Sequence, residues 1–203
     1  MGAIFRRFEK YTDILTPGSL VLEIGTDRGL KREEYQGSTK YIKELSDASL
    51  CRFITVDVDD ELLEPARQRG VDAWCMTGEE FCGKHLAGYG RPIAMAYLDN
   101  FDWDWDPPKA EPFIKVQQEL YKTKYNMVMN NVASQRAHVV QTMLMIPHLA
   151  EHCVVGFDDT FYMPHLGHYT GKGAAAVPLL LGLGFEIVEE EEEDPIYGII
   201  LKR

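Results

Sequence analysis

The sequence predicts an α/β fold: a seven-stranded, mostly parallel sheet with helices on both faces and an antiparallel last strand. Short apolar runs alternate with helical patterns along the chain, which is typical of a parallel sheet covered by helices. The 203 residues are enough to bury one sizeable core. A composition of 45% hydrophobic and 26% charged residues is that of a globular chain that folds on its own.

Seven apolar runs are the predicted strands, and five helical patterns separate most of them. The runs occupy residues 20–24, 52–58, 71–76, 93–99, 153–158, 185–190 and 197–202. An acidic run over 189–194 is most simply a solvated connection between the last two strands. The element order therefore ends in two successive strands.

The predicted helices have recognisable starts. Ser38, Asp59 or Asp60, and Thr77 or Gly78 stand before helical patterns, and short polar side chains or glycine suit the N-cap position. A longer helix is expected over 132–152, with a proline at 147 that can kink it or split off its last turn. A last helix, rich in small residues, is expected over 171–183.

Residues 100–131 fit this alternation least well. The segment is too long for a simple crossover loop, and loops of this length tend to carry function or to form a lid. We expect an active-site insertion that contains one helix over 112–125. Since no internal repeat or linker is visible, the whole chain, 1–203, is expected to form a single domain.

Charge and hydropathy limit the partners. A formal net charge of −11 argues against nucleic acid, because binding a phosphate backbone depends on clustered Lys and Arg. No segment reaches transmembrane length and the N-terminus lacks a signal-peptide core, so a cytoplasmic protein without a membrane partner is expected. The four cysteines lack paired spacing, which favours buried, reduced thiols over zinc or disulfides.

The stretch VLEIGTDRGL, residues 21–30, suits a ligand that lies against the backbone. An acid, Glu23, stands near the end of the first strand, and Gly25 and Gly29 follow in a turn, where glycine admits close approach. Asp27 stands where the dinucleotide fingerprint needs its second glycine, and no Lys-Ser/Thr pair of a P-loop follows. A nicotinamide or nucleoside triphosphate is therefore disfavoured. The alternative is a tight turn with a surface acid.

This stretch and VDVDDELLEPAR, residues 56–67, resemble the first two motifs of class I S-adenosylmethionine-dependent methyltransferases. The resemblance implies a Rossmann-like methyltransferase fold that binds S-adenosylmethionine. It places the methionine part of the cofactor beside Glu23, Gly25, Thr26 and Gly29, the ribose on Asp57, and the adenine near Met76, Thr77 and Gly78. A carboxylate is also a two-pronged acceptor for a vicinal diol, so the ribose assignment has independent physical sense.

Three further acids end predicted strands. Asp99 ends the fourth strand, and Asp158 and Asp159 end the fifth, so all three are expected at one sheet edge. Converging carboxylates repel unless a cation lies among them, and a hard divalent ion prefers oxygen ligands. The alternative is that Asp158 or Asp159 caps the next turn.

This acid set resembles the metal-dependent O-methyltransferases, of the catechol type and of the macrocin O-methyltransferase and cephalosporin-hydroxylase-like group. The resemblance implies a divalent metal, Mg²⁺ above all, on Asp99, Asp158 and Asp159, with Asp99 also beside the cofactor. The metal would orient and acidify a hydroxyl of a small-molecule acceptor.

A general base is expected after the acid pair, in YMPHLGHYTGKG. His165 is the first choice and Lys172 another candidate, although a loop histidine is as often a plain surface residue. Asp102, in FDWDWDPP, is a candidate for a further metal ligand or base. The tryptophans around it, Trp103 and Trp105, suit either a flat acceptor or simple packing.

Two functions other than methyl transfer remain open. One is a different reaction within the cephalosporin-hydroxylase-like group, and the other is a non-catalytic protein that binds the cofactor and regulates a partner. A homo-oligomer is also open, because residues 4–15 have an amphipathic pattern that suits a dimer arm or a lid over the cofactor.

Overall fold

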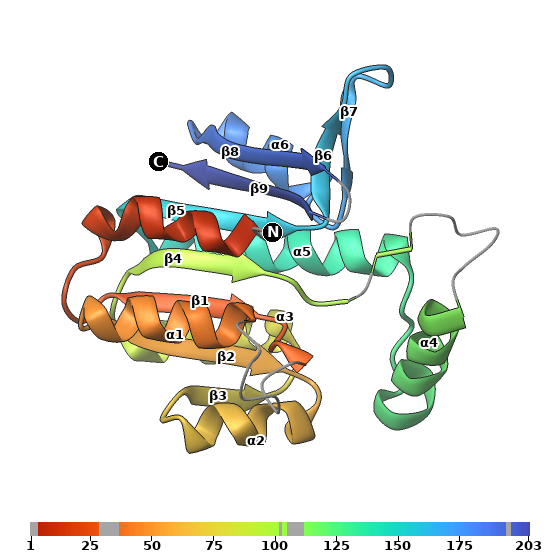
Figure 1. The fold of residues 1–203 in the computed structure, drawn as a ribbon, viewed down its shortest axis with the longest axis horizontal. Helices are drawn as coiled ribbons and strands as arrows, with labels where there is room; N and C mark the ends of the chain where they lie inside the picture. The colour runs from red at the N-terminus through yellow and green to blue at the C-terminus, as the bar shows by residue number, and fades with distance from the viewer. Residues whose placement is uncertain (1–3, 29–36, 102, 105–111, 194–195) are drawn as a thin grey trace.

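The computed structural model describes residues 4–28, 37–101, 103–104, 112–193 and 196–203. Its main sheet has seven strands in the order β3-β2-β1-β4-β5-β9-β8 (Figure 1). Neighbours among β1 to β5 pair in parallel, and β9 runs antiparallel to β5 and β8. The strands are β1 (Leu20–Ile24), β2 (Arg52–Asp57), β3 (Asp72–Cys75), β4 (Ile93–Leu98), β5 (Leu149–Asp158), β8 (Glu186–Glu193) and β9 (Ile196–Lys202). The predicted seven-stranded α/β sheet with its antiparallel last strand is confirmed.

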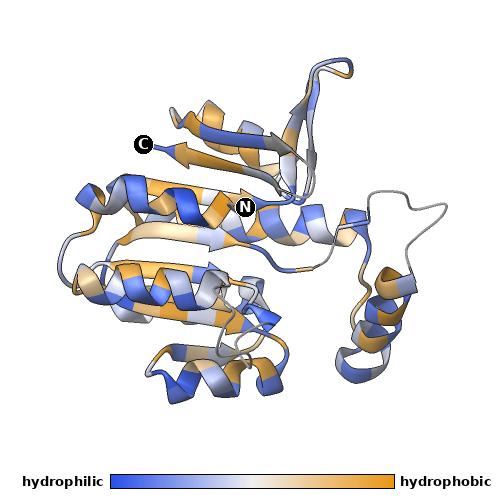
Figure 2. Ribbon diagram, in the orientation of Figure 1, coloured by the Kyte–Doolittle hydropathy of each residue, from blue (hydrophilic) through white to orange (hydrophobic). Residues whose placement is uncertain are grey.

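Helices cover both faces of the sheet (Figure 1). One face carries η1 (Ile4–Ile14), α1 (Ser38–Ala48) and α2 (Asp60–Gln68), and the other carries α3 (Gly78–Lys84), α5 (Asn131–Met145) and α6 (Ala176–Gly182). Successive strand residues alternate between the faces, so Val21 packs in the core under η1 and Leu22 in the core under α3 and α5. Apolar residues are accordingly concentrated in the strands (Figure 2).

Two of the three predicted helix starts are confirmed. Asp59 accepts a hydrogen bond from the Glu61 backbone N–H at 3.1 Å as the N-cap of α2. The Thr77 hydroxyl accepts one from the Glu80 N–H at 3.1 Å as the N-cap of α3. The prediction for Ser38 is wrong, because Gly37 is the N-cap of α1 and the Ser38 hydroxyl donates to a buried carboxylate instead.

Several predicted bounds are corrected. The helix expected over 132–152 ends at Met145, where a 3-10 turn, η5 (Ile146–His148), contains Pro147, and β5 begins at Leu149. The last helix begins at Ala176: Gly171 ends an antiparallel hairpin of β6 (Thr160–Met163) and β7 (His168–Gly171), and residues 172–175 form a turn. The sequence analysis treats this hairpin as a loop.

The expected helix of the 100–131 segment is present at its predicted bounds, as α4 (Pro112–Tyr125). It stands beside the sheet and its helix layers (Figure 1). A short 3-10 helix, η3 (Leu86–Tyr89), follows α3. In the described parts of the chain, no helix is long and apolar enough to cross a membrane. All four cysteines are free, but only Cys82 and Cys153 are buried and Cys75 is exposed, so the expected burial holds for two of them.

Candidate functional site

Two adjoining hollows lie at the carboxyl ends of β1, β2 and β4, the edge where ligands bind in open α/β sheets. One has a volume of about 310 Å³ and the other about 520 Å³. Both are lined by Asp57, Asn100, Phe101 and Tyr121.

The turn after β1 forms one wall of the larger hollow, through Gly25, Thr26, Asp27 and Arg28. Gly25 has a φ of +98°, and a Cβ there would lie 2.5 Å from the carbonyl carbon of Asp99. Only glycine lets the end of β1 pass this close to the end of β4. The structure therefore brings Gly25, Thr26 and Asp99 together as predicted, while Gly29 lies outside the described residues.

Glu23 supports this wall from behind. Its side chain is 0% exposed, and its carboxylate accepts hydrogen bonds of 2.7 Å from the hydroxyls of Ser38, Thr39 and Thr55. Thr39 in turn accepts from the Asp27 N–H at 2.9 Å. Glu23 lines neither hollow, and its predicted place on the methionine side stays a prediction. The three hydroxyls through which its carboxylate supports the turn were not predicted from the sequence.

Burial raises the pKa of Glu23 to about 8, although its three hydroxyl hydrogen bonds lower it. The carboxylate therefore takes up a proton more readily than a free glutamate.

Asp57 ends β2 and lines both hollows. One carboxylate oxygen accepts from the Thr26 N–H at 2.9 Å and the other from the Asp59 N–H at 2.8 Å. Burial raises the pKa of Asp57, against the lowering effect of these N–H groups and of Arg28. Each carboxylate oxygen has capacity for a second hydrogen bond, so the group is fixed in place and still able to accept from a ligand.

Met76, Thr77 and Gly78 line the smaller hollow together with Asp57, in the neighbourhood that the resemblance implies. A Cβ on Gly78 would lie 2.5 Å from the Cγ2 atom of Ile24, so α3 can begin this close to β1 only with glycine. Phe101 and Tyr121, the aromatic residues that line both hollows, were not predicted as site residues. Phe101 and Tyr121 pack with ring centroids 5.5 Å apart, which brings α4 onto both hollows.

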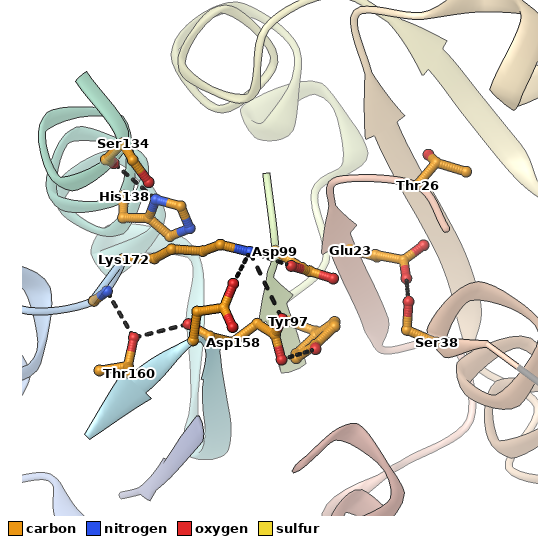
Figure 3. A network of polar contacts seen from close by, with 12 residues as sticks. Glu23, Thr26, Ser38, Tyr97, Asp99, Ser134, His138, Asp158, Thr160 and Lys172 are labelled. Atoms are coloured by element: carbon orange, nitrogen blue, oxygen red, sulfur yellow. Dashed lines mark hydrogen bonds and ion pairs between the residues drawn. The ribbon is translucent and has the colours of Figure 1, made fainter. Parts of the chain in front are cut away.

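The three predicted metal acids converge, but on a lysine (Figure 3). The Lys172 ammonium nitrogen lies 2.6 Å from Asp99, 3.0 Å from Asp159 and 3.6 Å from Asp158. The Lys172 side chain is 3% exposed, and the three carboxylates are 25–29% exposed. The Tyr97 hydroxyl donates to Asp158 at 2.8 Å. The positive charge that the converging acids need is therefore supplied by the chain itself.

Glycines on both sides hold Lys172 against the end of β5. Gly171 has a φ of +86°, and a Cβ there would lie 1.7 Å from the Asp159 carbonyl oxygen. A Cβ on Gly173 would lie 2.8 Å from the ring of Phe157. The Thr160 hydroxyl accepts from the Gly173 N–H and donates to the Asp158 carbonyl, both at 2.8 Å (Figure 3). The β6–β7 hairpin thus delivers the lysine to the acids.

The charges of the cluster depend on one another. Burial lowers the pKa of Lys172, but Asp159, Asp99 and Asp158 outweigh burial and hold that pKa well above its ordinary value. Burial, together with Asp99 and Asp159, raises the pKa of Asp158 well above its ordinary value. The three carboxylates therefore favour the ammonium form of Lys172, a hydrogen-bond donor, which argues against its predicted role as a base.

A divalent cation does not fit this cluster as it is arranged. Mg²⁺ needs oxygen ligands at about 2.1 Å around one point, and the ammonium nitrogen of Lys172 lies among these carboxylates. In the described ranges, no group of three or more His, Cys, Asp or Glu residues forms a candidate metal site. The predicted Mg²⁺ site is not formed by Asp99, Asp158 and Asp159 in this structure.

His165, the first choice for the base, lines neither hollow. His165 lies in the exposed turn of the hairpin, between the paired residues Met163 and His168. Lys172 follows Gly171 at the base of the hairpin, the end away from this turn. The position of His165 gives no support to its predicted role as the base, which stays a prediction. Asp102 and Trp105 lie outside the described residues. Trp103 is buried, with 9% of its surface exposed. This burial favours simple packing, one of its two predicted roles.

A buried histidine next to the cluster makes stability depend on pH. His138 in α5 has its Nδ1 atom 2.8 Å from the Ser134 carbonyl oxygen, and burial lowers its pKa to about 4. The unfolded chain binds a proton at higher pH than the folded one, so this group's contribution is full above pH 6.5 and is lost as pH falls towards 4.

We expect His138→Asn, which keeps a donor for Ser134 but cannot be protonated, to remove about 3 kcal/mol of the stability loss over this range. Urea unfolding of both proteins at several pH values measures the difference. If the free energy of unfolding changes equally with pH in the two proteins, this pH dependence does not come from His138.

Comparison with known proteins rests on structure alone. No family model matches the chain, and no curated protein matches it. An rRNA methylase from Streptococcus thermophilus aligns over 100% of this chain and 97% of its own, with a TM-score of 0.53 and 14% identity. The MycE methyltransferase from the mycinamycin biosynthetic pathway, in complex with Mg and SAH, aligns over 97% of this chain and 48% of its own, with a TM-score of 0.53 and 12% identity. The chain thus spans about half of MycE. It has the Rossmann-like fold of S-adenosylmethionine-dependent methyltransferases.

Proposed function

We propose that the protein is an S-adenosylmethionine-dependent methyltransferase. The observation that carries the proposal is the position of Asp57, a carboxylate fixed by two backbone N–H groups and shared by both hollows. The methyltransferase fold supports it. The cofactor's ribose hydroxyls donate to Asp57, its adenine lies beside Met76, Thr77 and Gly78, and its methionine part lies along the turn that begins at Gly25.

The acceptor is proposed to be a hydroxyl of a small molecule, bound at Asp99. This residue lines the larger hollow on one side and pairs with Lys172 on the other. An acceptor hydroxyl that donates to the Asp99 carboxylate is held beside the sulfonium. When bound, the cofactor would supply the methyl group as a sulfonium: the acceptor oxygen would form the new C–O bond, the sulfur would keep the electrons of the broken S–C bond, and the Asp99 carboxylate would accept the hydroxyl proton. Alignment of the reacting atoms is the main contribution of the chain.

RNA is a second candidate acceptor, because the Streptococcus thermophilus protein that shares this fold over 97% of its own chain is an rRNA methylase. The formal net charge of −11 favours the small molecule. Incubation with labelled cofactor and either total RNA or a panel of small hydroxyl compounds separates the two. Label in RNA alone would overturn the small-molecule proposal, and saturable cofactor binding with no labelled product would favour a regulatory protein.

Calorimetric titration with S-adenosylmethionine tests the proposal. Asp57→Ala removes charged hydrogen bonds worth about 1.5–3 kcal/mol each, so we expect affinity to fall at least 10-fold and by about 100-fold if both ribose bonds are lost. Asp60→Ala is the matched control, because Asp60 begins α2, is 67% exposed and pairs with Arg67. Its affinity should stay within about twofold of wild type. No cofactor binding by the wild-type protein would refute the proposal.

A further inference from the structure

The Lys172 ammonium occupies the point on which the acids at the ends of β4 and β5 converge. It has three N–H donors, and the three carboxylates lie at 2.6, 3.0 and 3.6 Å. A cation with oxygen ligands needs this same arrangement of acids around one centre. An ammonium and a divalent ion cannot share that centre, because both are positive and the lysine nitrogen fills the space.

This lysine is held by its backbone as well as by its charge. The Lys172 N–H donates to the Asp159 carbonyl oxygen at 3.1 Å, and Thr160 fixes Gly173 from the other side. Asp159 itself has a φ of +45°, a conformation that costs energy for any residue with a Cβ and that is often kept at functional sites. The hairpin base and the end of β5 are therefore shaped to bring this side chain to the acids.

The cluster also adjoins the proposed reaction site. Asp99 contacts Lys172 through one carboxylate oxygen. It also lines the larger hollow, together with the turn after β1. In a metal-dependent site, the cation orients the acceptor directly. Here the chain's own cation orients the carboxylate to which the acceptor donates, so Lys172 is a positioning residue.

We propose that Lys172 is the resident cation of the acceptor site, and that it replaces a divalent metal in fixing Asp99 for methyl transfer. This inference rests on the proposed methyltransferase function, because only that function gives the site an acceptor. The identity of the cation can be tested without any turnover. Removing the ammonium while keeping the acids should convert the cluster into a site for a divalent ion.

The experiment is a titration of the purified protein with Mn²⁺, with free Mn²⁺ counted by electron paramagnetic resonance. Wild-type protein and Asp159→Asn should bind the same number of Mn²⁺ ions, since the cluster is already filled by Lys172. Lys172→Ala should bind one more ion, and the double variant Lys172→Ala/Asp159→Asn should lose it. Melting temperature should follow: Mg²⁺ should raise it in Lys172→Ala by several degrees more than in wild type.

If the alanine variant fails to fold, wild-type protein and Asp159→Asn can still overturn the inference. One Mn²⁺ ion bound by the wild type and lost in Asp159→Asn would do so. A folded Lys172→Ala variant that gains no ion would also contradict it. Once an acceptor is found, wild-type turnover should stay within twofold on adding a chelator, and Lys172→Ala should show a new dependence on Mn²⁺. Failure to bind S-adenosylmethionine would refute the methyltransferase proposal without changing these ion counts.

Discussion

Replacing Lys172 by methionine is expected to lower the free energy of unfolding by about 2–4 kcal/mol at neutral pH. Removing one partner of a buried ion pair costs about 3–5 kcal/mol, because the other charge is left uncompensated. The value here is lower, since the three carboxylates are about a quarter exposed and water screens them. Methionine keeps much of the stem of the side chain, so the loss reports the charge. Urea unfolding measures it.

The loss should shrink as pH falls from 8 to 5. Burial and its acidic neighbours already raise the pKa of Asp158, and removal of Lys172 raises it further. The folded variant then binds more protons than the unfolded chain, so its stability rises as pH falls.

Two further variants make this result specific to the cluster. Adding Asp159→Asn to Lys172→Met should recover part of the stability, because it removes one of the repelling charges. Lys84→Met is the matched control, since Lys84 is 66% exposed and pairs with Glu80 one helical turn away, a pair worth about 0.5 kcal/mol or less. Equal losses for Lys84→Met and Lys172→Met would show that the buried ion pairs add no stability.

Replacing Glu23 by leucine is expected to cost about 3–5 kcal/mol of unfolding free energy. The change leaves the hydroxyls of Ser38, Thr39 and Thr55 without their acceptor, and a buried polar group without a partner costs about 1–3 kcal/mol. Since Thr39 also holds the Asp27 N–H, the turn after β1 should loosen and cofactor affinity should fall. Urea unfolding and cofactor titration measure the two effects.

Glutamine is the matched control at this position. Its amide oxygen can accept from Thr39 and Thr55, which share one oxygen of Glu23, and its NH₂ group can donate to Ser38, which bonds the other oxygen. We therefore expect Glu23→Gln to keep most of the stability at pH 7. A loss as large as that of leucine would contradict the hydrogen-bond account.

Comparison of the wild-type protein with Glu23→Gln also separates the effect of the charge from that of the hydrogen bonds. The pKa of Glu23 is raised from 4.5 to about 8, so the folded chain holds a proton that the unfolded chain releases. Its contribution to stability is full below pH 4.5 and is lost as pH rises through 8. The wild-type protein should lose stability over this range, by up to about 5 kcal/mol from this group, and Glu23→Gln should not.

The sequence predicted the sheet well because each strand carries its own local signal. The buried runs of β1 and β4 read as strands wherever they lie in the sheet, and Asp57 could be placed because it ends such a run. The convergence of Asp99 with Asp158 and Asp159 followed from the same rule about strand ends. These parts of the site depend on neighbours along the chain.

The parts that were missed depend on contacts between distant segments. The strands of the β6–β7 hairpin have only four residues each, TFYM and HYTG, which is too short for a periodic pattern to identify them. Lys172 could be singled out as a chemical candidate, but its partner Asp99 lies 73 residues away. The hydroxyls around Glu23 come from two other elements, α1 and β2. Local sequence patterns do not predict such contacts between distant residues.

The sequence separation of 73 residues between Asp99 and Lys172 also sets an order of events during synthesis. A growing chain that has emerged only as far as β5 already contains the acids of both strand ends, but not their lysine. Until the hairpin follows, these strand ends carry unbalanced negative charge, and docking β5 beside β4 brings like charges together. The pairing of β4 and β5 at their carboxyl ends is therefore one of the last steps that a nascent chain can complete.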